Sequence, residues 1–288
     1  MGQTAHFGDL PEEYSALENA RVVVIPVPFD RTSTWLKGAD KGPAAIIEAS
    51  AHMELYDIET DLEVYKKGIF TAEPVDGQQL PEDMVEMVAE QVQKYLENDK
   101  FVVVLGGEHS VSIGSARAHV VNNADITVLQ LDAHSDLRDE YEGSRYNHAC
   151  AMARIVELCP VVQVGIRSMD SSEKKALDTN RVIFARDIFT NKNWIEKVLS
   201  KLPENVYVTI DLDVFDPSIM PSTGTPEPGG LLWYDVLGLM RTVFEKRNVA
   251  GFDVVELCPD KRNKAPDFLA AKLIYKLLSY KLGSHFAI

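Results

Sequence analysis

The feature that most constrains the fold of this chain is a repeated alternation of wholly apolar strand segments with helical segments. Strands with no polar face belong in a sheet that is covered on both sides, and strand–helix–strand repeats make such a sheet parallel. We therefore expect an α/β fold of three layers, with a mainly parallel sheet of about eight strands and helices on both faces. The expected strands lie near 22–27, 68–72, 101–105, 126–131, 161–165, 182–185, 206–210 and 249–255.

Helical periodicity fills the intervals between these strands. Gly42-Pro43 predicts a helix start, because proline fits a first helical turn, and the helical pattern continues over 44–56. Further helices are expected over 81–98 and 266–282, the last of them packed on the sheet. No linker or internal repeat interrupts the 288 residues, so we predict a single domain over 1–288.

The composition limits the classes of partner. A net charge of −15 and a pI near 4.9 argue against nucleic acid and favour a cationic ligand. No apolar run approaches the roughly 20 residues that cross a bilayer, and the first residues lack the pattern of a signal peptide. The three cysteines form no CxxC pair, so neither a disulfide framework nor a zinc knuckle is indicated. We expect a cytoplasmic protein with no membrane partner.

The motif Asp132-Ala133-His134-Ser135-Asp136 directly follows the apolar run 126–131. In an extended backbone, side chains at alternate positions point to the same face, so two carboxylates and an imidazole would converge. The alternative is the polar face of an edge strand, which Asp and Ser suit poorly. The motif therefore predicts metal ligands.

Other strand ends carry similar residues. His109 follows Gly106-Gly107-Glu108, Asp211 and Asp213 end the 206–210 strand, and Glu256 ends the last strand. Each motif alone is weak, because a lone histidine near a helix start is often a cap and Asp-x-Asp is often a turn. Ligands of parallel sheets bind beyond the carboxyl ends of the strands, where these residues would meet. Two histidines and four aspartates suffice for two metals, and the absence of thiolate favours Mn²⁺, with Fe, Co or Zn possible.

Charge balance indicates what such a centre would bind. Four aspartates, Asp132, Asp136, Asp211 and Asp213, would neutralise two divalent metals. A water bridging the metals is acidified from a pKa of about 15.7 to about 7, which provides a hydroxide at neutral pH. That hydroxide leaves the site negative, and Glu256 adds to the charge. A cationic electrophile is therefore favoured over a phosphate ester.

The motifs at 106–110, 132–136 and 211–217, the last continuing through 222–230, resemble those of the ureohydrolases, the arginase and agmatinase family. The resemblance extends from about Val22 to the C-terminus. It implies an arginase-like fold with two Mn²⁺ per subunit and hydrolysis of a small cationic guanidino substrate to urea and an amine, by attack of a metal-bridging hydroxide. It also implies a homo-oligomer, a trimer or hexamer.

Residue by residue, the resemblance implies two ligand sets that share Asp132 and Asp211 as bridges. The sets are His109, Asp132, Asp136 and Asp211 for one metal, and Asp132, His134, Asp211 and Asp213 for the other. His148 matches the proton-transfer histidine of the family, and Glu256 matches the carboxylate that pairs with the guanidinium. The plain alternatives are a surface-loop histidine for His148 and a buried salt bridge for Glu256.

The loop after the second motif bears on the substrate. Arg138 stands where arginases carry an asparagine that recognises arginine, whereas 136–143 and 225–228 resemble agmatinases. We therefore predict agmatine as the substrate, giving putrescine and urea, a step of polyamine biosynthesis. Asp170 is predicted to contact the far end of the substrate. The ammonium group of agmatine could also be attracted by acidic loop residues, namely Asp139, Glu140 and Glu142.

Several alternatives remain open at this point. The substrate could be guanidinobutyrate, N1-aminopropylagmatine or arginine, and guanidinobutyrate would be favoured if Arg138 or Arg145 faced the pocket. A binuclear phosphoesterase uses similar ligands but needs cationic groups around its phosphate, which these strand ends lack. A catalytically silent metal-binding protein is disfavoured by the complete set of ligands and by the presence of His148 and Glu256.

Overall fold

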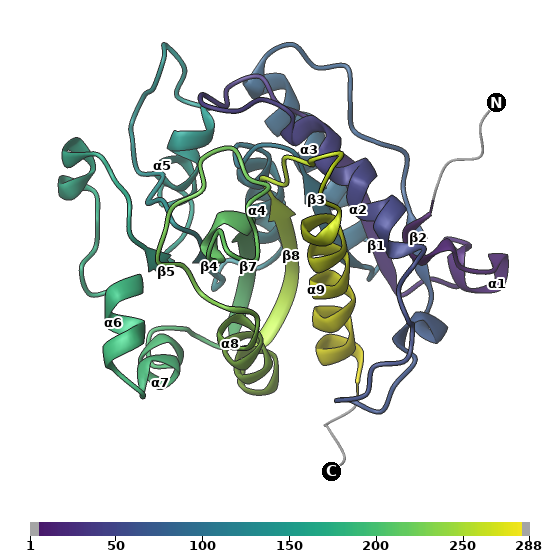
Figure 1. Ribbon diagram of the computed structural model, residues 1–288. Helices are drawn as coiled ribbons and strands as arrows, with labels where there is room; N and C mark the ends of the chain where they lie inside the picture. The colour runs from purple at the N-terminus through teal and green to yellow at the C-terminus, as the bar shows by residue number, and fades with distance from the viewer. Residues whose placement is uncertain (1–5, 284–288) are drawn as a thin grey trace.

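The computed structural model describes residues 6–283, and a sheet of eight parallel strands lies at its centre (Figure 1). The strand order is β2-β1-β3-β8-β7-β4-β5-β6. The α/β sheet predicted from the alternation is confirmed, and every strand pair is parallel. The strands are β1 (Val22–Val27), β2 (Ile69–Thr71), β3 (Phe101–Gly106), β4 (Thr127–Leu131), β5 (Val161–Ile166), β6 (Val182–Phe184), β7 (Asn205–Asp211) and β8 (Asn248–Val255).

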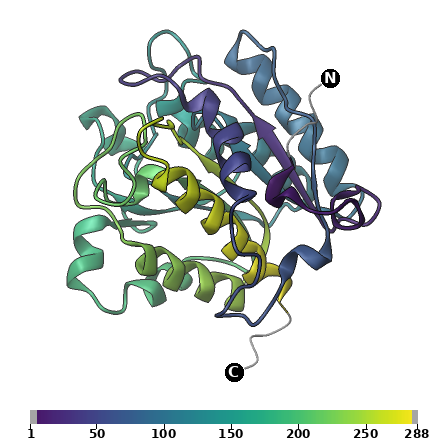
Figure 2. The same ribbon diagram turned by 45° about the vertical axis from the view of Figure 1, so that its right-hand side comes forward.

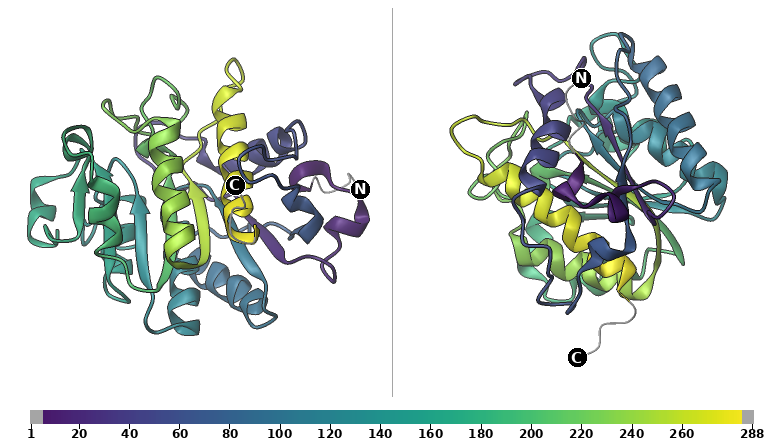
Figure 3. Two further views of the ribbon diagram at one scale, coloured as in Figure 1. Left: turned by 90° about the horizontal axis from the view of Figure 1, so that it is seen from below. Right: turned by 90° about the vertical axis from the view of Figure 1, so that its right-hand side faces the viewer.

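Helices cover both faces of the sheet, so that the molecule has three layers (Figure 3). One face packs against α2, α6, α7, α8 and α9, and the other against α3, α4 and α5. Figure 2 shows α2 and α9 side by side on the first face. The helices are α1 (Glu12–Ser15), α2 (Gly42–Ser50), α3 (Pro81–Leu96), α4 (Val111–Asn122), α5 (Ala151–Ile155), α6 (Ala185–Thr190), α7 (Trp194–Leu199), α8 (Trp233–Lys246) and α9 (Ala265–Leu282).

Strand β1 illustrates why the strands are apolar throughout. Val22 and Val24 pack into the core on the α9 side, whereas Val23 and Ile25 pack into the core on the α3 side. Successive strand residues point to opposite faces, so both sets must be apolar when both faces are buried. The core is therefore two hydrophobic layers separated by the sheet.

The helix predicted over 44–56 is shorter in the structure. Helix α2 ends at Ser50, whose hydroxyl donates to Ile47 O at 2.6 Å and accepts from Gly8 N at 2.7 Å. Further on, Asp57 pairs with Leu62 in an antiparallel bridge that turns the chain. The bond from Gly8 joins the end of α2 to a segment 42 residues away, and periodicity carries no signal for it or for the bridge that turns the chain.

The position of β8 decides where the functional edge lies. Although β8 comes last in the chain, it pairs between β3 and β7. The ends of β3, β8, β7 and β4 are thereby four consecutive neighbours. Within residues 6–283, no helix is long and apolar enough to cross a membrane.

A buried ion pair fastens α9 to the segment after α2. Lys276 Nζ lies 2.9 Å from both carboxylate oxygens of Asp57, and both side chains are buried. Burial by itself would raise the pKa of Asp57, but hydrogen bonds from Lys276 and Thr60 outweigh it and lower that pKa. The pair therefore stabilises the fold above the ordinary pKa of an aspartate and loses this effect as the pH falls through the lowered value.

Removing the lysine should expose the cost of this buried charge. Lys276→Met leaves Asp57 buried without its cation, and we expect a loss of about 3–5 kcal/mol in the free energy of unfolding. The double variant Asp57→Asn with Lys276→Met should recover part of the loss, because no charge is then buried. Urea unfolding at neutral pH measures both. Equal losses of unfolding free energy in the single and double variants would show that the buried charge of Asp57 is not what destabilises Lys276→Met.

Candidate metal centre and substrate pocket

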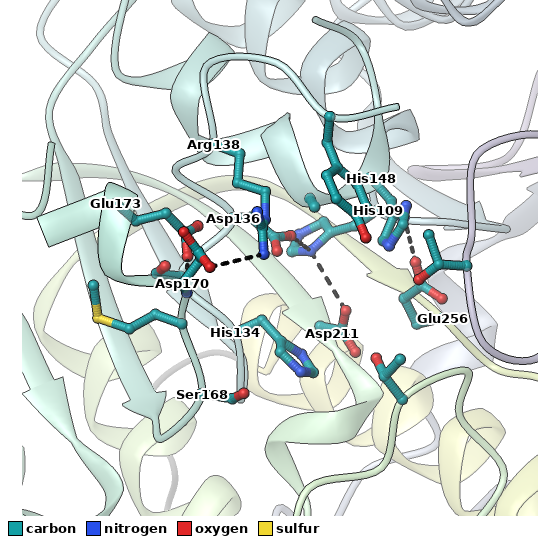
Figure 4. A pocket seen from close by; sticks show the side chains of 16 residues that line it. His109, His134, Asp136, Arg138, His148, Ser168, Asp170, Glu173, Asp211 and Glu256 are labelled. Atoms are coloured by element: carbon teal, nitrogen blue, oxygen red, sulfur yellow. Dashed lines mark hydrogen bonds and ion pairs between the residues drawn. The ribbon is translucent and has the colours of Figure 1, made fainter. Parts of the chain in front are cut away.

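The predicted site residues converge at the carboxyl edge of the sheet (Figure 4). His109 follows β3, Glu256 follows β8, Asp211 ends β7 and Asp132 follows β4. Because these four strands are consecutive neighbours, their ends bring the side chains together. The aspartates are buried, as are His109 and Glu256.

A first group surrounds the imidazole of His109. Its Nδ1 lies 3.1 Å from Asp132 Oδ2, 2.9 Å from Asp136 Oδ2 and 3.4 Å from Asp211 Oδ2. His109, Asp132 and Asp211 offer ligand atoms that all lie within 4.8 Å of one another. All members of the ligand set predicted for one metal are thus around one nitrogen.

A second group surrounds His134. Its Nδ1 lies 2.8 Å from Asp213 Oδ2 and 3.8 Å from Asp132 Oδ1. Asp132 therefore faces His109 with one carboxylate oxygen and His134 with the other, which is the arrangement of a bridging ligand. Asp211 belongs to the first group only, and one of its oxygens accepts from Asp213 N at 2.9 Å. The bridging roles of Asp132 and Asp211 stay predictions.

The backbone at the two strand ends departs in part from the alternation we expected. Strand β4 ends at Leu131, and Asp136 has a left-handed backbone with φ of 51°. Asp213 lies in the short turn Leu212–Val214, which the Asp211 side chain caps. The predicted ligands meet. Beyond the end of β4, His134 still pairs with Ser168 in a parallel bridge, and the left-handed Asp136 is where the backbone departs from the expected extended course.

The electrostatics of the cluster are those of crowded, buried acids. Burial, together with repulsion from Asp213 and Asp136, raises the pKa of Asp132 to about 7. Burial and Asp213 likewise raise the pKa of Asp211 well above its ordinary value. Burial would lower the pKa of His134, but the neighbouring aspartates, Asp213 first, raise it to about 11. The acids thus need positive charge beside them, and bound cations would supply it.

The tautomer of His109 also fits a metal. Its Nε2 lies 3.0 Å from the Thr209 hydroxyl, and that hydroxyl donates to Asp253 Oδ1 at 2.6 Å. Since the single hydroxyl proton of Thr209 goes to the carboxylate, its oxygen accepts from Nε2–H, and Nδ1 is the nitrogen left for the aspartates. Nδ1 is buried without a hydrogen-bond partner, although three carboxylates surround it. After loss of the Nδ1 proton, the lone pair that a metal ligand needs would face these carboxylates.

The pocket above the cluster has a volume of about 280 Å³. Glu256, at φ of 66°, lines it, and its Oε1 accepts from His109 N at 2.8 Å. Burial and the nearby Glu108 raise the pKa of Glu256 well above its ordinary value. His148 lines the pocket too, on the short helical turn His148–Cys150.

The outer wall carries the predicted specificity residues. Asp170 lines the pocket, but it also caps the helical turn Ser171–Lys175 by accepting from Ser172 N at 2.9 Å. Arg138 also lines the pocket, 3.7 Å from Asp170 Oδ2 and stacked over the Tyr141 ring at 4.5 Å. The contact of Asp170 with substrate stays a prediction.

The loop acids and Arg145 lie elsewhere. Arg145 pairs with Asp139 at 2.9 Å and with Glu157 at 3.1 Å, so it is not among the pocket residues. Asp139 is further engaged by Arg154 at 2.7 Å. The expectation that Asp139 attracts the substrate is therefore not favoured by its pairing.

Several residues that support the site have no role in the sequence-based prediction. Gln130 donates to Asp132 Oδ2 at 2.6 Å and to His134 O at 3.2 Å, which orients both. Arg167 donates to Asp213 O at 2.6 Å and to Glu227 O at 2.8 Å, tying two loops together. Their one signal in the sequence is a polar residue within or just after an otherwise apolar strand.

The comparisons with known proteins agree with this geometry. The model of the arginase family matches residues 20–279. The chain belongs to the arginase family. The predicted resemblance, the arginase-like fold and the assignment as a ureohydrolase-type enzyme are thereby confirmed.

Relatives and solved structures narrow the comparison. N(1)-aminopropylagmatine ureohydrolase of Synechocystis sp. is 39% identical over 93% of this chain and 92% of its own length. Agmatinase of Pyrococcus horikoshii is 34% identical over 91% of this chain and 92% of its own length. The crystal structure of agmatine ureohydrolase of Thermoplasma volcanium superposes with a TM-score of 0.88 at 30% identity, covering 98% of this chain and 95% of that one.

Metal binding should release protons. The aspartates raise the pKa of His134 to about 11, and against the opposing effect of burial they raise that of His109 well above its ordinary value. Both Nδ1 atoms must lose a proton to bind a metal, and the raised pKa values of Asp132 and Asp211 add to the protons displaced, so we expect release of at least two protons at neutral pH and tighter binding as the pH rises. Calorimetric titration of Mn²⁺ in buffers of different ionisation enthalpy measures this release. His134→Asn should release about one proton fewer, and no release from the wild type would contradict the assignment.

Proposed function

We propose that this enzyme hydrolyses the guanidinium group of a polyamine-type substrate to urea and an amine, with two divalent metals held by the two histidine–aspartate groups. The observation that carries the proposal is the convergence of both groups with Glu256 and His148 on one pocket. When bound, the metals would acidify the water that attacks the guanidinium carbon. Mn²⁺ is the proposed metal, because carboxylates and imidazoles without thiolate suit it.

Glu256 is the proposed partner of the guanidinium. Its carboxylate is buried at the pocket floor, and its raised pKa reflects the cost of placing a negative charge there. A bound guanidinium would remove that cost by a two-point, charge-assisted contact. Glu256 would thus strengthen the binding of cationic guanidinium groups but not that of neutral ureas or amides.

His148 is the proposed proton donor to the leaving amine. It lines the same pocket as Glu256 and lies outside both metal-ligand groups. An imidazole suits this role because it can donate a proton, and the amine leaves only after it gains one. The histidine–aspartate groups would hold the metals, while His148 would protonate the amine as the carbon–nitrogen bond breaks.

Among substrates, we place N1-aminopropylagmatine first and agmatine second. Our sequence analysis placed agmatine first. Relatives named N(1)-aminopropylagmatine ureohydrolase in Synechocystis sp. and in two strains of Thermus thermophilus are 39% identical to this chain, against 34% for the agmatinase of Pyrococcus horikoshii. Both substrates have cationic tails and give an amine and urea, so the product would be a polyamine. A homo-oligomer and a cytoplasmic location stay proposals.

Guanidinobutyrate is the second candidate, because Arg138 lines the pocket. The guanidinium of Arg138 could pair with the carboxylate end of guanidinobutyrate. However, Arg138 already faces Asp170 at 3.7 Å, so the wall carries both signs of charge. Arg138 is also the one lysine or arginine among the described residues that line this pocket, which leaves a phosphate ester with little cationic support.

A substrate panel tests this order. After Mn²⁺ loading, urea release should be fastest in kcat/KM from N1-aminopropylagmatine, then agmatine, with arginine and guanidinobutyrate slower. Arg138→Ala should leave the two polyamine substrates within a few-fold, whereas a tenfold loss on guanidinobutyrate, about 1.4 kcal/mol, would show that Arg138 binds its carboxylate. Faster turnover of guanidinobutyrate or arginine than of both polyamine substrates would contradict the proposal.

Two further variants separate metal binding from proton transfer. Asp132→Ala removes the carboxylate that faces both groups, so activity and metal content should fall together. His148→Ala should lower kcat by about 10²-fold or more while metal content stays at the wild-type level. Elemental analysis of the purified variants gives the metal content. Equal metal loss in both variants would show that these roles are wrong.

A further inference from the structure

The loop after β1 has no part in the function proposed so far, yet it is built around a buried carboxylate. Glu108 is fully buried, and it accepts from Thr32 N at 2.5 Å and Ser33 N at 3.1 Å. The hydroxyls of Thr32 and Ser110 each donate to Glu108 Oε1 at 2.6 Å. Four donors contact this carboxylate, and each of its oxygens accepts from two of them.

The hydroxyl of Thr32 connects this carboxylate to His148. Thr32 has one hydroxyl proton, which it donates at 2.6 Å to Glu108 Oε1, an oxygen that also accepts from the Ser110 hydroxyl. The oxygen of Thr32 then accepts from His148 N at 2.8 Å, and it lies 3.4 Å from His148 Nδ1. A hydroxyl with its proton already donated can meet Nδ1 only as an acceptor.

We infer that Thr32, with Glu108 behind it, is a positioning residue that fixes the tautomer of His148. The ring carries its proton on Nδ1, directed at Thr32, and Nε2 keeps a lone pair on the far side of the ring. A proton is then gained or lost only at Nε2. The use of this proton in catalysis rests on the proposed function, whereas the tautomer itself follows from the contacts.

The arrangement is the counterpart of the one at His109. There Thr209, with Asp253 behind it, holds Nε2–H and leaves Nδ1 for the metal ligands. Here Thr32, with Glu108 behind it, holds Nδ1–H and leaves Nε2. The two series of hydrogen bonds thus leave opposite ring nitrogens available. Nδ1 of His109 is available to bind a metal, and Nε2 of His148 is available to exchange a proton in the same pocket.

A purely structural role for Glu108 would give a different pattern of effects. Its bonds to the backbone of Thr32 and Ser33 would hold the loop even without the Thr32 hydroxyl. Thr32→Val removes the hydroxyl and keeps these backbone donors, and Thr32→Ser restores a hydroxyl. Ser110→Ala is the matched control, because it removes another donor from the same carboxylate oxygen and leaves the Thr32 contact to His148 in place.

Solid-state ¹⁵N NMR of histidine-labelled, Zn²⁺-loaded enzyme reads the tautomer directly, and the His148→Gln spectrum identifies the signals of His148. At a pH where the ring is neutral, we expect Nδ1 protonated and Nε2 unprotonated in the wild type, Thr32→Ser and Ser110→Ala. Thr32→Val should shift His148 towards the Nε2-protonated form. An Nε2-protonated wild type, or an unchanged Thr32→Val spectrum, would overturn the inference.

Kinetics supply a second readout on the Mn²⁺ enzyme. Thr32→Val should lower kcat by about tenfold with KM and metal content unchanged, because orientation of one proton donor is lost. Thr32→Ser should recover most of kcat, and a Thr32→Val enzyme with unchanged kcat would contradict the inference. The NMR result needs no substrate. If no guanidino compound yields urea but the tautomer is as stated, the positioning by Thr32 stands and only the proposed function fails.

Discussion

The structure depends on a concentration of buried negative charge at one edge of the sheet. Asp132, Asp211, Asp213 and Glu256 are all buried there, beside only two histidines of the metal groups. Desolvation and mutual repulsion raise the pKa of three of them, and Asp213 escapes because His134 lies 2.8 Å away. An apolar three-layer fold can tolerate such an edge because cations, held or bound, offset the charge.

The position of β8 is what makes this edge possible. By pairing between β3 and β7, it places Glu256 beside the Gly107–His109 turn, where Glu256 N donates to Gly107 O at 2.7 Å. The Gly107 backbone lies so close to Phe29 O that a side chain would clash, since an added Cβ would be 2.0 Å away. The candidate metal groups, Glu256 and the loop after β1 thus meet around one glycine.

Sequence reasoning predicted the sheet and the identity of the metal groups because both leave local signals. Apolar runs mark strands that are covered on both faces, and Asp-His-Asp or Gly-Gly-Glu-His marks a strand end. The conformation of those ends leaves weaker signals: Asp136 is left-handed and Asp213 lies in a turn. Thr32 and Glu108 are 76 residues apart, and Thr32 and His148 are 116 apart, so no pattern along the chain relates them.

The candidate metal centre is easier to derive than the substrate, because buried residues have fewer possible contacts than residues on an exposed wall. The centre is fixed by buried groups whose contacts allow few alternatives, down to which nitrogen of His109 faces the aspartates. The outer wall is partly exposed and combines Arg138, Asp170 and Tyr141, which already contact one another. A tail that binds there must compete with an existing ion pair and a cation–π contact. Recognition of the tail is therefore a small difference between interactions of similar strength, whereas the proposed pairing of a guanidinium with the buried carboxylate of Glu256 would not be.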